Sequence, residues 1–173
     1  MATHSWFAVK VRTSAEALVE LSLRDKCEET FLPTYIDCRQ YSDRVKQVKA
    51  ALFPGYLFCR FNPNRRLPIL QTPGVQQVVG SSFGPTPIDD RDILGLQRAV
   101  AQELSARPWP FLRSGDRVRI GYGSMAGVEG ILLYEKGAQL LVISVELLQR
   151  SVAIEIGRDW VRPVHTTSIA ATA

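Results

Sequence analysis

Residues that usually build metal sites and disulfide frameworks are scarce in this chain. Its 173 residues include three cysteines, Cys27, Cys38 and Cys59, and two histidines, His4 and His165. The cysteines are too few and too widely spaced for a disulfide-stapled fold or a metal knuckle, so we expect free thiols. The histidines stand near opposite ends of the chain and could share a site only if both ends folded together. The sequence therefore predicts no metal site and no cofactor.

Catalytic groupings, signal sequences and membrane segments are missing as well. The sequence contains no recognisable serine–histidine–aspartate or cysteine–histidine set and no glycine-rich phosphate loop. No apolar run approaches the roughly 20 residues of a membrane-spanning helix, and no apolar signal core follows Met1. These absences predict a cytoplasmic protein that is not an enzyme and has no membrane partner. A small enzyme with an unrecognised site is the weakest alternative.

Basic charge is present and is unevenly distributed. The formal net charge is only +4. Between Arg39 and Arg66, however, seven basic residues face one acidic residue, Asp43, so the rest of the chain is slightly acidic. A local excess of positive charge on an otherwise neutral protein indicates a polyanionic partner such as nucleic acid. The alternative is a solvated loop that its charge keeps soluble.

The first part of the chain predicts strands and helices in alternation. Residues 6–12 alternate with a period of two, which predicts a strand with one buried face. Thr13 and Glu16 have the spacing of a capping box, and the apolar stripe that follows predicts a helix over about 14–27. The later pattern predicts a strand over 31–39, an exposed hairpin or loop over 40–50, a strand over 52–61, a short helix over 65–71 and a strand over 75–79.

The clearest helix signal begins at Asp89. This aspartate can cap the helix, and further acidic residues follow in the first turn, where the helix dipole favours them. Ile88 and Ile93 have the spacing of a hydrophobic staple, and an apolar stripe continues to Leu104. The order of elements predicts an α+β fold in which helices pack on an N-terminal antiparallel sheet.

The composition changes after this helix. Pro108 and Pro110 cannot continue it, because neither has an N–H group and each disfavours the helical conformation of its predecessor. Short strand-like runs separated by glycine-bearing turns follow and predict a small all-β, SH3-like barrel. The expected division is an N-terminal domain over 1–105, a proline-rich linker over 106–110, the barrel over 111–164 and a disordered tail over 165–173.

A set of motifs runs through both predicted domains. In chain order they are Trp6-Phe7, Phe53-Pro54-Gly55-Tyr56-Leu57-Phe58, Thr72-Pro73-Gly74-Val75, Pro87-Ile88, Gly115-Asp116-Arg117-Val118-Arg119-Ile120 and Met125-Ala126-Gly127-Val128-Glu129-Gly130. Each is weak alone, but together they resemble the NGN domain and the KOW module of NusG-family transcription elongation and antitermination factors. The resemblance covers about 6–164. The KOW motif residues would be Gly115, Asp116, Val118, Gly127, Glu129 and Gly130.

The last predicted strand departs from the general family pattern. Residues 147–156 lack the glycine before Arg150 and the Thr-Pro after it that general NusG proteins usually carry. This departure resembles the specialised RfaH-like and UpxY-like antiterminators. We nevertheless expect a β-barrel rather than the helical hairpin that the RfaH C-terminal domain can adopt, because apolar and β-branched residues are dense over 142–145 and 152–154.

The resemblance implies binding rather than chemistry. In this family the NGN domain sits on the clamp helices of the largest RNA polymerase subunit and bridges to the second-largest subunit, which suppresses pausing and termination. The polymerase-binding residues carried over to this sequence are Phe7, Tyr35, Phe53, Pro54, Gly55, Tyr56, Arg65 and Arg66. Among them, Phe53 and Tyr56 are expected to anchor the partner, whereas Phe58 is expected in the core.

The resemblance also implies further partners. Basic residues expected along the DNA of the elongation complex are Lys10, Arg12, Arg24, Arg44, Lys46 and Lys49. The KOW barrel is expected to recruit a small-subunit ribosomal protein or the termination factor Rho. The rival interpretation is a ribosome-associated RNA-binding protein, because KOW modules also occur in ribosomal proteins.

Overall fold

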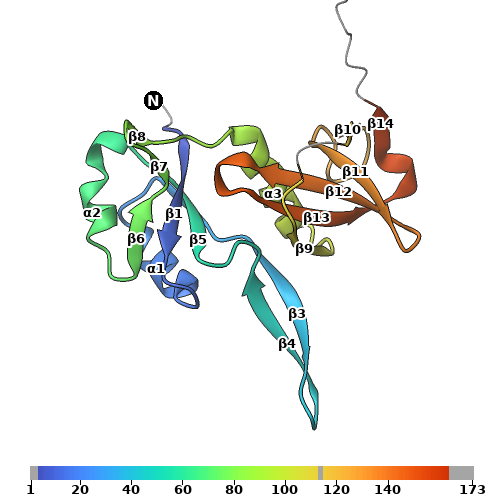
Figure 1. Ribbon diagram of the computed structural model, residues 1–173, viewed down its shortest axis with the longest axis horizontal. Helices are drawn as coiled ribbons and strands as arrows, with labels where there is room; N and C mark the ends of the chain where they lie inside the picture. Colours follow the sequence, from blue (N-terminus) through green and yellow to red (C-terminus); the bar gives the residue numbers. More distant parts are fainter. Residues whose placement is uncertain (1–3, 113–114, 164–173) are drawn as a thin grey trace, which may run out of the picture.

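The computed structural model describes residues 4–112 and 115–163 and contains two sheet-based domains (Figure 1). The first is built on a four-stranded sheet in the order β2-β5-β1-β6, with helices beside it. The second is a six-stranded antiparallel sheet in the order β14-β10-β11-β12-β13-β9. This arrangement confirms the predicted fold class, an α+β domain followed by a small β-barrel.

The elements of the first domain are β1 (Trp6–Val11), α1 (Glu16–Leu23), β2 (Glu29–Phe31), β3 (Thr34–Gln40), β4 (Val45–Ala51), β5 (Tyr56–Arg60), η1 (Pro63–Arg65), α2 (Leu67–Leu70), β6 (Val75–Val78), β7 (Gly80–Ser81), β8 (Gly84–Pro85) and α3 (Asp90–Ala101). Those of the second are β9 (Ala106–Trp109), β10 (Asp116–Ile120), β11 (Glu129–Glu135), β12 (Ala138–Val145), η2 (Glu146–Leu148), β13 (Arg150–Ile156), η3 (Arg158–Trp160) and β14 (Val161–Pro163).

Strand β1 is buried on both faces, so the prediction of one buried face is wrong. Phe7 and Val9 pack in an apolar cluster with Val19 of α1. Trp6 and Ala8, on the opposite face, belong to a second cluster that also contains residues of α3 and of the barrel. The alternation in the sequence could not reveal this second layer, because small Ala8 is compatible with either environment.

Helix α1 is shorter than predicted and lacks the predicted capping box. Its N-cap is Ala15, which makes no side-chain capping hydrogen bond, and Ser14 adopts a left-handed conformation with φ of 70°. Glu16 does not turn back onto the backbone at Thr13. Its carboxylate is buried and accepts a hydrogen bond from the backbone N–H of Gly55, 2.8 Å away.

Strands β3 and β4 form a separate two-stranded ribbon that projects from the body of the domain (Figure 1). Pro33 lies between β2 and β3, so the single strand predicted over 31–39 is interrupted there. Its two strands pair antiparallel without interruption, from Thr34 opposite Ala51 to Gln40 opposite Val45. The segment predicted over 40–50 as an exposed hairpin or loop therefore contains the end of β3, the turn of this hairpin and nearly all of β4.

Helix α3 lies between the two domains. As predicted, Asp89 caps it by accepting a hydrogen bond from the backbone N–H of Arg91 at 2.8 Å. Gly95 on this helix lies so close to the barrel that an added Cβ would come within 3.1 Å of side-chain atoms of Val128 and Ile143. A glycine at this position therefore allows α3 to pack closely against the barrel.

The segment that the sequence predicts to be a linker contains a strand of the second sheet. Strand β9, which falls in the expected linker, pairs with β13, with Pro108 opposite Val152 and Trp109 opposite Ser151. It is the edge of the sheet, where a proline costs little because the outer side of the strand has no neighbour to bond. The guanidinium of Arg107 lies 4.6 Å from the Trp109 ring centroid.

The part of the chain that the structure describes contains neither a membrane-spanning helix nor a cluster of metal-binding side chains. None of its helices is long and apolar enough to span a membrane. No group of three or more histidine, cysteine, aspartate or glutamate side chains among residues 4–112 and 115–163 could hold a metal ion. His165 and the predicted tail lie outside these residues. His4 pairs with Glu28.

Candidate protein-binding surface

A tight turn precedes β5 and leaves the side chain of Pro54 exposed and that of Tyr56 partly exposed. The backbone N–H of Tyr56 donates to the carbonyl of Phe53 at 2.9 Å, and Gly55 has φ of +79°. Proline followed by a residue with positive φ is the arrangement of a type II turn, and glycine tolerates that φ without strain. The turn buries Phe53 and exposes Pro54.

The backbone of this turn is held from two neighbouring segments. The N–H of Val11, at the end of β1, donates to the carbonyl of Gly55 at 2.9 Å. The N–H of Gly55 donates to the buried carboxylate of Glu16 at 2.8 Å. A charge-assisted hydrogen bond in a buried position is stronger than a neutral one. Glu16 therefore positions the turn. Its spacing from Thr13 had indicated a capping role instead.

Two of the aromatic residues expected at the binding surface lie in the core instead. Phe7 is 3% exposed, with its ring centroid 4.8 Å from that of Phe61. Phe53 is 1% exposed and meets Phe58 edge to face at 5.4 Å. The kink at the turn directs Phe53 inward, so its ring supports the surface from below. Direct contact with a partner is open to Pro54, Tyr56 and half-buried Tyr35.

The barrel covers part of this surface. The guanidinium of Arg150, on β13, lies 5.2 Å from the centroid of the Tyr56 ring and donates a hydrogen bond to the carbonyl of Pro54 at 3.3 Å. A groove of about 350 Å³ separates the turn from Trp109 and Phe111 of the second domain. A cation over an aromatic face contributes on the order of 1 kcal/mol, so this contact can be broken at moderate cost.

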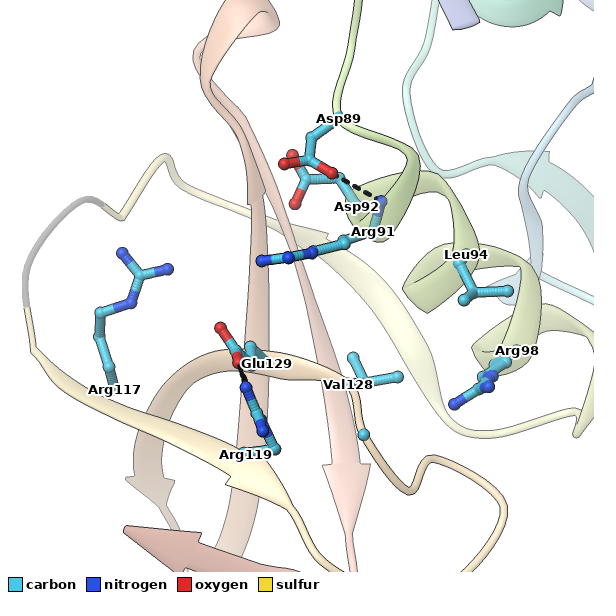
Figure 2. Close-up of a pocket in the computed structure, with 10 residues that line it drawn as sticks. Asp89, Arg91, Asp92, Leu94, Arg98, Arg117, Arg119, Val128 and Glu129 are labelled. Carbon is cyan, nitrogen blue, oxygen red and sulfur yellow. Dashed lines mark hydrogen bonds and ion pairs between the residues drawn. The ribbon is translucent and has the colours of Figure 1, made fainter. Parts of the chain in front are cut away.

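A charged cavity lies between α3 and the barrel (Figure 2). Its volume is about 330 Å³. The α3 side contributes Asp89, Arg91 and Asp92, and the barrel contributes Arg117 and an Arg119–Glu129 ion pair in which Nε and Oε1 are 2.9 Å apart. The Arg119 guanidinium lowers the pKa of Glu129.

Asp92 is the group in this cavity whose ionisation is most disturbed. Burial, with a smaller contribution from the negative charges of Asp89 and Glu146, raises the pKa of its carboxyl from 3.8 to about 6, although Arg117 opposes the rise. A carboxyl whose pKa is higher in the folded protein than in the unfolded chain stabilises the fold when it is protonated. Its contribution is fully present below pH 3.8 and is lost as the pH rises through about 6.

Replacing Asp92 with asparagine is therefore expected to stabilise the protein at neutral pH. The variant should be more stable than the wild type by about 1 kcal/mol at pH 7, after allowance for solvent screening, and about equal to it at pH 4. Urea unfolding over this pH range measures the difference. Asp90→Asn is the control, because Asp90 is in the same helical turn but its side chain is 68% exposed. A difference for Asp92→Asn that does not change with pH would contradict the prediction.

The KOW motif residues have mainly structural positions in the second domain. Val118 is buried, and Gly130 has no room for a side chain, because an added Cβ would be 2.7 Å from the carbonyl oxygen of Val142. Gly115 and Gly127 have φ of +147° and +86°, which favour glycine. Asp116 begins β10, where it faces Leu132 of β11. These positions explain the motif as a requirement of the fold.

The predicted nucleic-acid-binding residues do not form one patch. Arg44, Lys46 and Lys49 are exposed on the β3–β4 ribbon, and Arg39 joins them because it lies opposite Lys46. Lys10 and Arg12 lie at the end of β1 instead, with Lys10 opposite Tyr56. Arg24 follows α1 and pairs with Glu20 at 3.7 Å, whereas Arg65 and Arg66 are exposed around α2. Arg39 pairs with Asp37 at 3.0 Å. The ribbon is thus the main concentration of exposed basic charge among these residues.

Arg60 belongs to the basic segment of the sequence but not to this exposed charge. Its guanidinium lies 5.0 Å from the Trp6 ring centroid and pairs with Glu29 at 3.3 Å and with Asp90 at 3.8 Å. Its side chain is only 15% exposed. The local excess of basic residues in the sequence could not show that Arg60 is paired and mostly buried, unlike the exposed cations of the ribbon.

The structure thus combines an α+β domain, which carries a rigid turn and a basic ribbon, with a β-barrel that follows it. Comparison with known proteins identifies the class. The family model described as "Transcription termination factor nusG" matches residues 4–97. The chain belongs to the NusG family, and this membership makes it a transcription termination/antitermination factor.

Relatives and solved structures extend the match over most of the chain. The transcription termination/antitermination protein NusG of Campylobacter jejuni is 26% identical over 168 residues, covering 90% of this chain and 95% of the relative. The corresponding protein of Lactococcus lactis is 27% identical, covering 94% and 90%. A structure described as "Domain interaction in Thermotoga maritima NusG" is 20% identical with a TM-score of 0.56, covering 92% of this chain and 97% of that one. At this identity the structural likeness bears on the fold alone.

Proposed function

We propose that this chain binds transcribing RNA polymerase through the turn before β5, suppresses pausing and termination, and recruits a second partner through its barrel. The observation that carries the proposal is the construction of the turn. Glu16 and Val11 fix its backbone, Phe53 supports it from the core, and Tyr56 remains at the surface. Such a rigid aromatic anchor suits a partner helix, because little conformational entropy is lost on binding.

The residues take distinct roles in this proposal. Tyr56 and Tyr35 supply apolar rings with polar tips to the clamp helices of the largest subunit, and Pro54 supplies a rigid apolar contact. Arg65 and Arg66, which are exposed around α2, would meet the second-largest subunit. The complex would hold the polymerase closed around its nucleic acid, which disfavours paused states.

The barrel and the polymerase would compete for one surface. Arg150 lies over the ring of Tyr56, so a partner helix can reach that ring only after the contact opens. Binding would therefore free the barrel as it fills the surface. The freed barrel would then recruit the second partner, a small-subunit ribosomal protein or Rho.

Single-round transcription with purified RNA polymerase tests the proposed activity. On a template with a defined pause and a terminator, adding the chain is expected to shorten the pause and increase read-through. The control is Pro54→Ala with Tyr56→Ala, which should restore the behaviour of polymerase alone. A chain that lengthens pausing, or leaves both events unchanged while bound to polymerase, would overturn the proposed activity.

Nucleic-acid binding by the free chain is expected to be weak and strongly dependent on salt. Its main source would be the exposed ribbon, so reversing Lys46 and Lys49 to glutamate should weaken binding and reduce the slope of log K against log salt by about 1–2. Titration of a labelled DNA duplex at several salt concentrations measures this slope. The control reverses Lys136, which is exposed in the second domain. Tight binding that ignores salt would show that the contact is not electrostatic.

A further inference from the structure

Two cysteines that are distant in the sequence meet at the edge of the first domain. Cys27 follows α1, and Cys59 lies in β5. The pairing of β2 with β5 brings them together, since the N–H of Glu28 donates to the carbonyl of Arg60 at 2.8 Å and Thr30 lies opposite Cys59. Both side chains pack in the same apolar cluster. The spacing in the sequence, which indicated scattered thiols, gives no sign of this contact.

The two thiols differ in exposure and in acidity. Cys59 is 0% exposed, whereas Cys27 is only partly buried. A hydrogen bond from the Cys59 thiol lowers the pKa of Cys27, and the charge of Lys26 adds to this effect against the opposing effect of burial. The same hydrogen bond and burial raise the pKa of Cys59. Cys27 is thus the more accessible of the two sulfurs, and Cys59 is its protected neighbour.

We propose that Cys27 and Cys59 form a peroxide-responsive pair that closes into an intramolecular disulfide. A partly exposed cysteine beside a second, protected thiol is the arrangement in which oxidation of the first is followed by attack of the second. Cys38 has no part in this pair, because it lies exposed on the β3–β4 ribbon.

The chemistry needs only a hydroperoxide as the oxidant. The Cys27 thiolate attacks the terminal oxygen of the peroxide, the O–O bond breaks, and Cys27 becomes a sulfenic acid while the peroxide leaves as water or an alcohol. The Cys59 sulfur then attacks the Cys27 sulfur, the S–O bond breaks, and the hydroxyl leaves as water with the proton of the Cys59 thiol. The two sulfurs together lose two electrons, and the peroxide gains them.

The disulfide would join the chain after α1 to the strand that begins at Tyr56. It would close a loop of about 30 residues and so restrict the unfolded chain, which is expected to raise the melting temperature by roughly 5 °C. Oxidation would thereby stiffen the sheet on which the candidate surface is built. The inference itself is independent of whether that surface binds polymerase.

The test uses the full chain with Cys38→Ser, which removes the exposed thiol that could link two molecules. The protein is treated with hydrogen peroxide in the presence of dimedone, which traps sulfenic acids, and is then analysed by mass spectrometry. The expected product has lost two hydrogens, carries no dimedone and yields a peptide joined through Cys27 and Cys59. Thiol reductant should reverse both the mass change and the rise in melting temperature.

A second variant tests the order of the two steps. With Cys59→Ala added, the folded protein is expected to carry dimedone on Cys27, because no neighbour remains to displace the hydroxyl. Circular dichroism shows whether the Cys59→Ala variant is folded. If it is not, the presence or absence of the Cys27–Cys59 disulfide in the Cys38→Ser protein still supports or overturns the proposal. Dimedone on Cys27 with Cys59 still present, or two thiols that remain free after peroxide treatment, would overturn the proposal.

Discussion

Replacing Phe53 with alanine is expected to lower the free energy of unfolding by about 3–5 kcal/mol, the cost of deleting a buried aromatic ring. The ring is 1% exposed and packs edge to face against Phe58 at a centroid distance of 5.4 Å. Its cluster contains residues of both domains, including Ile93 and Leu141, so the cavity would weaken a shared core. Urea denaturation followed by tryptophan fluorescence measures the loss.

Phe83→Ala provides the matched control for this variant. Phe83 is 99% exposed between β7 and β8, so removal of its ring should change stability by no more than about 0.5 kcal/mol. If Phe53→Ala kept wild-type stability, the ring would not have the packing role that the structure gives it.

Replacing Tyr56 with alanine is expected to weaken polymerase binding roughly 30-fold or more, because truncating an aromatic anchor at an interface costs about 2–4 kcal/mol. Tyr56 is only partly buried, and part of its cover is the Arg150 side chain rather than the core. The variant should therefore remain folded. Affinity for a fragment containing the clamp helices and the melting temperature are measured on the same samples.

Arg150→Ala distinguishes the contribution of the Tyr56 ring from that of the Arg150 side chain that covers it. It removes the cover over Tyr56 and leaves the ring in place, so binding should be unchanged or tighter. Normal binding by folded Tyr56→Ala would exclude the anchor role, and a variant that unfolds would assign Tyr56 to the core.

Short sequence patterns predict those helices and strands that are determined by residues close to one another in the chain. The staple and the N-cap at Asp89 identified α3, because both depend on residues within one helical turn. The alternation of strands and glycine-bearing turns likewise predicted the barrel. The sequence predicts a linker over the proline-rich segment 106–110, since no local rule shows that Ala106–Trp109 has a partner strand in β13.

The candidate site depends on contacts that local patterns do not encode. The motif identified the turn at Pro54-Gly55, but not the hydrogen bond that Glu16 accepts from Gly55 across 39 positions of sequence. Alternation was equally unable to assign Phe53, because the turn resets the direction of the side chains on either side of it. The contact between Arg150 and Tyr56 joins two domains, so it could not be predicted from either alone.

Recovery of RNA polymerase on the immobilised full chain tests the central claim most directly. A lysate is passed over the wild-type chain and over Tyr56→Ala, and the retained proteins are identified after a wash at moderate salt. The two largest polymerase subunits are expected to be retained by the wild type and strongly depleted on the variant. Retention of ribosomal RNA and ribosomal proteins without polymerase would contradict it and favour a ribosome-associated RNA-binding protein.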